Sequence, residues 1–354
     1  MRRAMLVAGM TAALVGVAAP ANATALQKLT VQTGSAAPSL YFIPVYVAEA
    51  AGFFKQEGLE VEVRYTRGAP VAAQIVVAGQ ADAGSFSFDP IVLGWGKGLR
   101  GKFFYEFMRS LIYYVAIPEE SPIKSLRDLA GKKIGVASAS SAANMFTTAM
   151  LRDAGVDPSK VSFVPVGVGN QAAAAIRSHQ VDALALWNGP YSQLESLGLK
   201  FRYIRHQKLG GVGSTGYFAT EQTIQARAKD LAGFCRAIAK ATAFTLASPE
   251  AAVRVYWKLF PSERQGKDEQ ESLSRSVKEL KFVERDFTIQ DRNVKKYGYV
   301  DAQEMQLFID VLKQETGTQD VPKASDIITN QFIDGANQFD PKEVERAVAV
   351  WRGS

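Results

Sequence analysis

Short strands and short helices alternate between residues 29 and 90, and this alternation restricts the fold more than any other feature. Residues 29–33, 59–65 and 81–86 have the spacing of strands, whereas 40–51 and 69–78 have the apolar spacing of helices. Strands that alternate with helices in this way are typical of a parallel sheet whose crossovers are helical. We therefore predict an α/β fold.

The same layout recurs at an offset of 100 residues. Residues 80–83 read Gln-Ala-Asp-Ala and residues 180–183 read Gln-Val-Asp-Ala, and each motif ends an alanine-rich helix and starts a strand. The two helices occupy residues 69–78 and 169–178. The repeat predicts two α/β lobes of related design.

The chain is expected to cross between the two lobes twice, near residues 113–117 and 216–219, so that two strands form a hinge. Lobe 1 would then comprise residues 26–115 with 216–354, and lobe 2 would comprise 116–215. The C-terminal part of the chain has mostly helical patterns, and we expect it to pack on lobe 1.

The N-terminus has the pattern of a signal peptide. Arg2 and Arg3 precede an apolar run over residues 4–19, and small residues follow up to residue 25. Cleavage after Ala23 or Ala25 fits the rule of small residues at the cleavage site. We expect residues 1–25 to be removed on export, which predicts an exported protein.

Composition argues against several classes of protein. The only cysteine, Cys235, lies far from the cleavage region, so we expect no lipid anchor and no intrachain disulfide. One cysteine and two histidines do not make a Cys/His zinc site, and we expect no metal or cofactor. The formal charge is +6, or +4 without Arg2 and Arg3, and no basic block occurs. Nucleic acid is therefore not an expected partner.

A serine-rich turn between a strand and a helix is the first candidate for ligand contact. The predicted strand covers residues 132–137, the turn contains Ser138, Ser140 and Ser141, and the helix covers 142–154. Backbone N–H groups at a helix start bind anions together with the positive end of the helix dipole. The alternative is that a serine only caps the helix.

Ligands in open α/β sheets bind beyond the carboxyl ends of the strands, at the starts of helices. Residues at these positions complete the predicted site. Beyond the serine turn they are Ser35, Tyr41, Gly68, Ser87, Phe88, Asp89, Asn170, Trp187, Asn188, Tyr191, Ser214 and Thr215.

Two of these residues have both a structural and a functional interpretation. Asp89 precedes Pro90 and could cap a helix, or its carboxylate could accept a hydrogen bond from an amine or ring N–H of the ligand. Trp187 could stack on a planar ligand or pack within its own lobe. The sequence leaves both alternatives open.

Five blocks of sequence resemble the periplasmic solute-binding proteins of ABC importers, and more closely the NMT1/THI5-like group. That group includes proteins that bind nitrate, sulfonates, taurine and thiamine precursors. The resemblance extends roughly from residue 29 to 217. The matching blocks are residues 44–54, 57–61, 77–82, 123–136 and 181–183 with Trp187.

The resemblance implies a type II binding protein of two lobes joined by two hinge strands, with the ligand held between them. We expect a monomer that delivers its solute to a membrane permease. The serines suggest an anionic group on the solute and Asp89 a nitrogen-bearing part, so a sulfonate, an aromatic carboxylate or a pyrimidine each fits in part.

Two alternatives to a transport protein remain. One branch of the resembling family synthesises the thiamine pyrimidine and carries a cysteine-rich iron motif, which the single Cys235 does not match. No Ser/His/Asp arrangement is evident either, so we expect no enzymatic activity. The second alternative is an accessory protein that senses a ligand for a membrane receptor.

Overall fold

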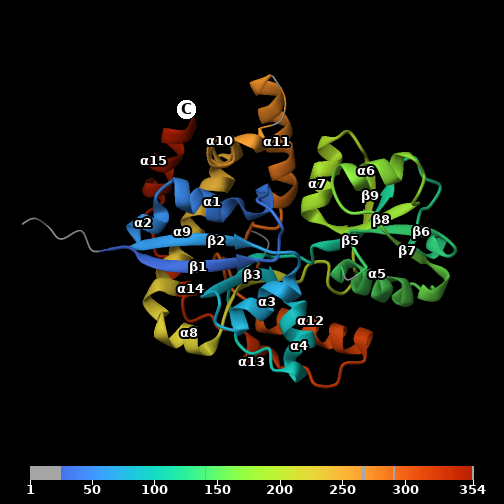
Figure 1. Cartoon of the computed structure of the whole chain (residues 1–354), viewed down its shortest axis with the longest axis horizontal. Coiled ribbons are helices and arrows are strands. Elements are labelled where there is room, and N and C mark those ends of the chain that lie inside the picture. The colour runs from blue at the N-terminus through green and yellow to red at the C-terminus, as the bar shows by residue number, and fades with distance from the viewer. Residues whose placement is uncertain (1–24, 140, 265, 267, 290–291, 353–354) are drawn as a thin grey trace, which may run out of the picture.

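The computed structural model describes residues 25–139, 141–264, 266, 268–289 and 292–352 (Figure 1). Residues 1–24 of the predicted signal peptide, and Ser140 of the serine turn, lie outside the described residues. Within the described part, no helix is long and apolar enough to cross a membrane.

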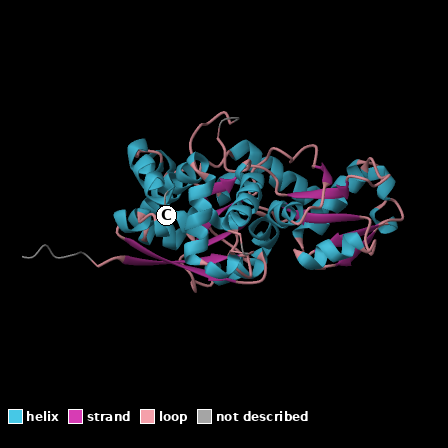
Figure 2. Cartoon of the chain, turned by 90° about the horizontal axis from the view of Figure 1, so that it is seen from above, coloured by secondary structure: helices cyan, strands magenta, loops and turns pink. Residues whose placement is uncertain are grey.

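Ten strands form two separate five-stranded sheets in the described residues, as predicted for two α/β lobes (Figure 2). The first has the order β2-β1-β3-β10-β4 and the second β7-β6-β8-β5-β9. The strands of the first sheet are β1 Gln27–Thr33, β2 Leu59–Tyr65, β3 Ala83–Ser87, β4 Lys102–Met108 and β10 Thr215–Ala219. Those of the second are β5 Tyr113–Pro118, β6 Lys133–Val136, β7 Ser162–Pro165, β8 Ala183–Trp187 and β9 Phe201–Ile204.

Both sheets have the same pattern of strand directions. Three parallel strands, β2-β1-β3 or β7-β6-β8, are followed by one strand that runs antiparallel to its neighbours, β10 or β5. Each antiparallel strand follows a crossing of the chain from one sheet to the other. The two-lobe fold of type II with two hinge strands is therefore confirmed, while the predicted lobe boundaries stay a prediction.

The sequence repeat has a structural cause. Asp82 accepts hydrogen bonds from the backbone N–H and the hydroxyl of Thr30, at 2.7 and 2.8 Å, and so fastens the start of β3 to β1. Asp182 accepts a hydrogen bond from the backbone N–H of Lys133 at 2.8 Å and fastens β8 to β6 in the same way. The repeated aspartate is thus a structural residue in both lobes.

Helices cover both sheets. In the N-terminal part and in lobe 2 these are η1 Leu40–Phe42, α1 Ile43–Ala50, α2 Phe53–Gln56, α3 Ala69–Val77, α4 Asp89–Gly94, η2 Trp95–Lys97, η3 Leu126–Leu129, α5 Ala142–Asp153, η4 Pro158–Lys160, α6 Asn170–Arg177 and α7 Asn188–Ser196. In the C-terminal part they are α8 Glu221–Ala226, α9 Ala228–Ala247, α10 Pro249–Leu259, η5 Pro261–Glu263, α11 Glu269–Glu284, α12 Ala302–Thr316, α13 Ala324–Ile327, α14 Ile333–Ala336 and α15 Pro341–Arg352.

The C-terminal helices pack on lobe 1, as predicted, and two of them also reach lobe 2. Helices α9, α10 and α15 pack against one another, and α9 and α10 cover α1. Helix α11, however, packs along α7, and α12 contacts both α4 and α5 (Figure 1). The C-terminal segment therefore contacts the second lobe from two sides, in addition to the hinge strands.

Candidate functional site

Five buried hydroxyl groups gather at the carboxyl end of β3, and we call them the hydroxyl cluster: Ser85, Ser87, Thr215, Tyr41 and Tyr113. Ser85 and Ser87 share one face of β3 because side chains alternate along a strand. Thr215 lies opposite Ser87 on β10. The hydroxyl of Tyr41 donates to Oγ1 of Thr215 at 3.3 Å, and that of Tyr113 donates to Oγ of Ser87 at 3.4 Å.

Asp89 lies directly beyond this strand end, and its side chain is 5% exposed. The residue before α4 is Phe88, and no side chain caps the start of that helix, so Asp89 is not the N-cap. Its carboxylate interacts with the Ser87 hydroxyl and its own backbone N–H, while Oδ1 has no hydrogen-bond partner. Burial raises the pKa of Asp89 to about 6. A buried acceptor without a partner makes Asp89 a candidate for ligand contact.

Tyr113 connects the hydroxyl cluster to lobe 2. It begins β5, where the chain enters the second sheet, and its ring stacks on that of Phe146 in α5 with centroids 5.1 Å apart. Burial, and next the charge of Asp89, raise the pKa of Tyr113. The cluster therefore lies where the lobes meet rather than inside one lobe.

Tyr41 and Trp187 approach each other from opposite lobes across Gly189. A Cβ atom placed on Gly189 would lie 3.4 Å from Nε1 of Trp187 and 3.7 Å from Cδ2 of Tyr41. Trp187 is partly exposed, whereas Tyr41 is buried with its ring edge-on to Phe42 and Phe107. Tyr41 belongs to the hydroxyl cluster, and a stacking role for Trp187 stays a prediction.

Several other predicted site residues have structural partners. The hydroxyl of Ser214 donates to the carbonyl of Ser110 at 2.8 Å. The hydroxyl of Tyr191 is buried and bonds to three backbone groups, those of Leu186, Tyr114 and Leu184. The ring of Phe88 packs between Phe103 and Phe308. These contacts are all made within the protein, and a direct role in ligand binding stays a prediction for each of the three residues.

Asn188 joins the two lobes through a residue far along the chain. Its Nδ2 donates to Oδ2 of Asp286 at 2.6 Å, and the hydroxyl of Ser110 donates to Oδ1 of the same carboxylate. Asp286 follows α11, and both Asn188 and Asp286 are buried. The amide of Asn188 is thus already engaged in this structure.

The serine turn has less evidence for ligand contact. The hydroxyl of Ser141 accepts a hydrogen bond from the backbone N–H of Ala143 at 3.4 Å and caps α5. Ser138 is exposed, and its carbonyl accepts a hydrogen bond from the amide of Asn144. The capping alternative is therefore observed for Ser141, while an anion contact stays a prediction.

The three remaining predicted residues are Ser35, Gly68 and Asn170. Ser35 is partly exposed and donates to the carbonyl of Ala37 at 2.9 Å. Gly68 precedes α3 with a φ of 105°, which favours glycine, and Asn170 is exposed at the start of α6. A role in binding stays a prediction for all three.

Sequence reasoning missed Ser85, Tyr113 and Phe146. The first could have been found from the alternation along β3, which places Ser85 on the same face as Ser87. Tyr113 begins a strand that was predicted only as part of the hinge. Its pairing with Phe146 depends on tertiary packing, for which the sequence gives no local signal.

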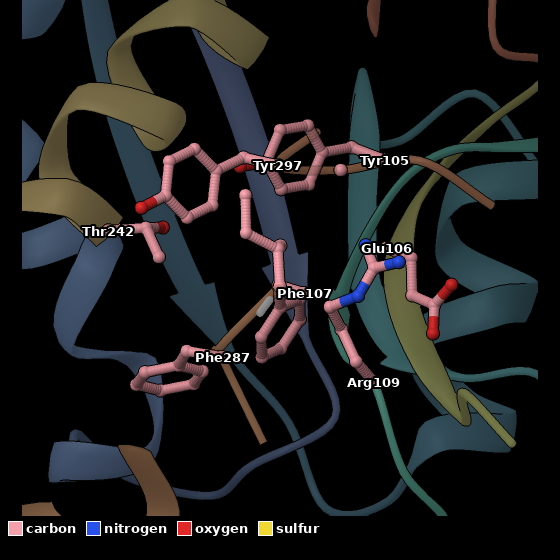
Figure 3. A pocket seen from close by; sticks show the side chains of 9 residues that line it. Tyr105, Glu106, Phe107, Arg109, Thr242, Phe287 and Tyr297 are labelled. Atoms are coloured by element: carbon pink, nitrogen blue, oxygen red, sulfur yellow. The ribbon is translucent and has the colours of Figure 1, made fainter. Parts of the chain in front are cut away.

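Residues of β4 and of the C-terminal part of the chain line a small pocket (Figure 3). Its lining residues are Tyr105, Glu106, Phe107, Arg109, Thr242, Phe287, Ile289, Tyr297 and Gly298. It holds about 10 Å³, which is close to the minimum for one water molecule. Burial raises the pKa of Glu106 in its wall to about 8. The pocket is too small for an organic solute.

Among the described residues, no group of three His, Cys, Asp or Glu side chains is arranged to hold a metal ion. The thiol of Cys235 is buried in α9, and burial raises its pKa.

The model of the family described as NMT1/THI5 like matches residues 39–252. A riboflavin-binding protein, RibY of Chloroflexus aurantiacus, is 26% identical over 92% of each chain. A 4-amino-5-hydroxymethyl-2-methylpyrimidine phosphate synthase of Legionella pneumophila is 26% identical over 63% of this chain and 71% of that protein. The periplasmic aliphatic sulphonate binding protein SsuA of Escherichia coli has a similar fold, with a TM-score of 0.64, 18% identity and coverage of 85% and 91% of the two chains.

Proposed function

The chain belongs to the NMT1/THI5-like family, and from this premise we propose that it is the periplasmic solute-binding component of an ABC importer. It captures a small organic solute between its lobes and delivers it to a membrane permease. We further propose that residues 1–25 are the export signal and that the mature protein acts as a monomer.

One observation carries this proposal: two buried polar atoms without partners lie at the carboxyl end of β3. They are Oγ of Ser85 and Oδ1 of Asp89. A buried polar atom without a partner costs about 1–3 kcal/mol. A solute that supplied the missing hydrogen bonds would return this free energy on binding.

The position of these atoms supports capture by closure. The hydroxyl cluster belongs mainly to lobe 1, whereas Phe146 and Trp187 belong to lobe 2, and Tyr113 stacks between the cluster and Phe146. A solute held here would contact both lobes at once. It would then favour the closed conformation by the difference between its affinities for the closed and open states.

The test is to identify what the protein binds. Native mass spectrometry of the purified chain should find a small molecule that copurifies. That molecule, added back to stripped protein, should raise the melting temperature and reduce the radius of gyration in solution scattering. A protein that responds in neither assay to a broad panel of anions, amines and heterocycles would contradict the proposal.

A second candidate function is pyrimidine synthesis, because two relatives carry the name of a phosphate synthase. We rank it below transport, since the one thiol is buried in α9. Iron or pyridoxal phosphate bound in a stoichiometric amount to the purified chain would reverse this ranking.

A further inference from the structure

The carboxylate of Asp89 has one acceptor position that the protein leaves open. Its side chain is only 5% exposed, and its interactions within the chain are with the Ser87 hydroxyl and its own backbone N–H. Oδ1 has no partner. Because a carboxylate oxygen only accepts hydrogen bonds, a ligand that satisfies it must carry a donor.

The surroundings of Asp89 do not balance its charge. The groups that lower its pKa are the Ser87 hydroxyl and a backbone N–H, both of which are neutral, while burial raises the pKa. The other members of the hydroxyl cluster are neutral as well, and the phenol pKa values of Tyr41 and Tyr113 are raised further by burial. At neutral pH the site therefore holds a buried negative charge that favours a positive or N–H-bearing partner. An anionic group placed beside it would be repelled.

Aromatic rings belong to or contact the hydroxyl cluster, which Asp89 joins through the Ser87 hydroxyl. Tyr113 and Phe146 stack nearly parallel, at an angle of 14°. Tyr41 is fixed by edge contacts with Phe42 and Phe107 and faces Trp187 across Gly189. Rigid rings on both lobes suit a planar solute, because the faces and edges of aromatic rings pack well on one another.

On the basis of the proposed binding function, we propose that the solute is a planar nitrogen heterocycle that donates an N–H to Oδ1 of Asp89. This contact makes Asp89 the residue that selects between nitrogen-bearing and anionic solutes. It differs from the expectation of an anion held at the serine turn, where Ser141 already caps α5. It also differs from the sulphonate named for SsuA.

The experiment compares two sets of probes on three proteins by isothermal titration calorimetry. The first set is riboflavin, 4-amino-2-methylpyrimidine and N3-methylriboflavin, which lacks the imide N–H of riboflavin. The second set is methanesulfonate and nitrate. The proteins are the wild type, Asp89→Asn and, as a control at the other candidate site, Ser141→Ala.

We expect an N–H heterocycle to bind the wild type and to bind Asp89→Asn at least about tenfold more weakly, as loss of a charge-assisted hydrogen bond requires. If riboflavin is the binder, N-methylation should weaken binding to the wild type to a similar degree and have little effect on Asp89→Asn. Ser141→Ala should stay within about threefold of the wild type.

Binding of methanesulfonate or nitrate that is unchanged or tighter in Asp89→Asn would overturn this inference and leave the proposed transport function intact. Binding of a heterocycle that is equally tight in the wild type and in Asp89→Asn would also overturn it. If neither set bound and no solute copurified, the binding function itself would fail, and the inference with it.

Discussion

Replacing Gly213 by alanine tests the packing at the second crossing between the lobes. Gly213 lies in the connection from β9 to β10, and a Cβ added there would lie 1.4 Å from Oε1 of Glu106. Cβ atoms do not approach other atoms closer than 3.0 Å, so the carboxylate would have to move by at least 3.0 − 1.4 = 1.6 Å. The backbone at Gly213 does not have a positive φ, so the strain comes from this contact.

The cost of this movement follows from the space around Glu106. The side chain is buried, and the neighbouring pocket holds only about 10 Å³. A displaced carboxylate and a new methyl group therefore cannot both be accommodated without shifts of the surrounding chain. Overpacking of this kind destabilises proteins by about 1–3 kcal/mol, and we expect the upper half of that range because the displaced group is polar.

Urea denaturation of four variants measures the effect. Gly213→Ala should lower the free energy of unfolding by about 2–3 kcal/mol. Gly211→Ala is the matched control, because a Cβ there meets nothing within 4 Å, and its effect should be below about 0.5 kcal/mol. The other two variants are Glu106→Ala and its combination with Gly213→Ala. In the Glu106→Ala background the Gly213→Ala change should also cost less than about 0.5 kcal/mol, since the clash is gone.

The double-mutant cycle shows whether the contact with the Glu106 carboxylate causes the loss of stability in Gly213→Ala. If Gly213→Ala is as costly in the Glu106→Ala background as in the wild type, the contact between Gly213 and the carboxylate does not cause the loss. If Gly213→Ala is as harmless as Gly211→Ala, the placement of Glu106 beside the crossing is wrong.

Three further predictions concern charge, closure and the core. Burial raises the pKa of Asp89 from 3.8 to about 6 in the folded protein, so its ionisation should lower the free energy of unfolding by about 2 kcal/mol as pH rises from 4 to 7. Asp89→Asn should remove that part of the pH dependence of urea unfolding measured without solute, and an unchanged pH profile would contradict this. Asn188→Ala removes the 2.6 Å hydrogen bond to Asp286, so it should weaken solute binding by about 1–3 kcal/mol in calorimetry, whereas equal affinity would show that the bond does not contribute to closure. Tyr191→Phe should lower the melting temperature through the loss of three hydrogen bonds and leave solute affinity unchanged, and weaker binding would place Tyr191 in the site itself.

Much of the fold could be predicted because its signals are local. The alternation over residues 59–65 gives β2 with the same bounds, and the helical spacing of residues 142–154 gives α5 to within one residue. The predicted strand at residues 81–86 lies two residues early at its start. Asp82 is used to fasten β1, so the strand β3 begins only at Ala83.

The site was predictable only where it follows the ends of strands. Ser87 and Asp89 follow from the rule that ligands bind at carboxyl edges, and the structure places both in one buried group. The contacts that involve the C-terminal segment were not predictable in this way. Asn188 and Asp286 are 98 residues apart in sequence, and no local pattern indicates that the end of α11 reaches α7.

These long-range contacts change what closure requires of the solute. Besides the Asn188–Asp286 hydrogen bond, the ring of Phe308 in α12 packs on Phe146, and Arg152 forms an ion pair with Glu315 at 3.1 Å. Both of these contacts join the C-terminal segment to α5. Together they hold the two lobes in the arrangement seen in this structure.

If the lobes close on a solute as we propose, contacts that already join them reduce the free energy that the solute has to supply. The buried acceptor on Asp89 acts in the opposite direction, because closure without a donor leaves its charge desolvated. Under the proposed function, the C-terminal contacts would set how readily the lobes close, while Asp89 would set which solute makes closure favourable. Weakening the contacts of the C-terminal segment should reduce affinity for every solute to a similar extent. Changing Asp89 should instead alter the order of preference among solutes.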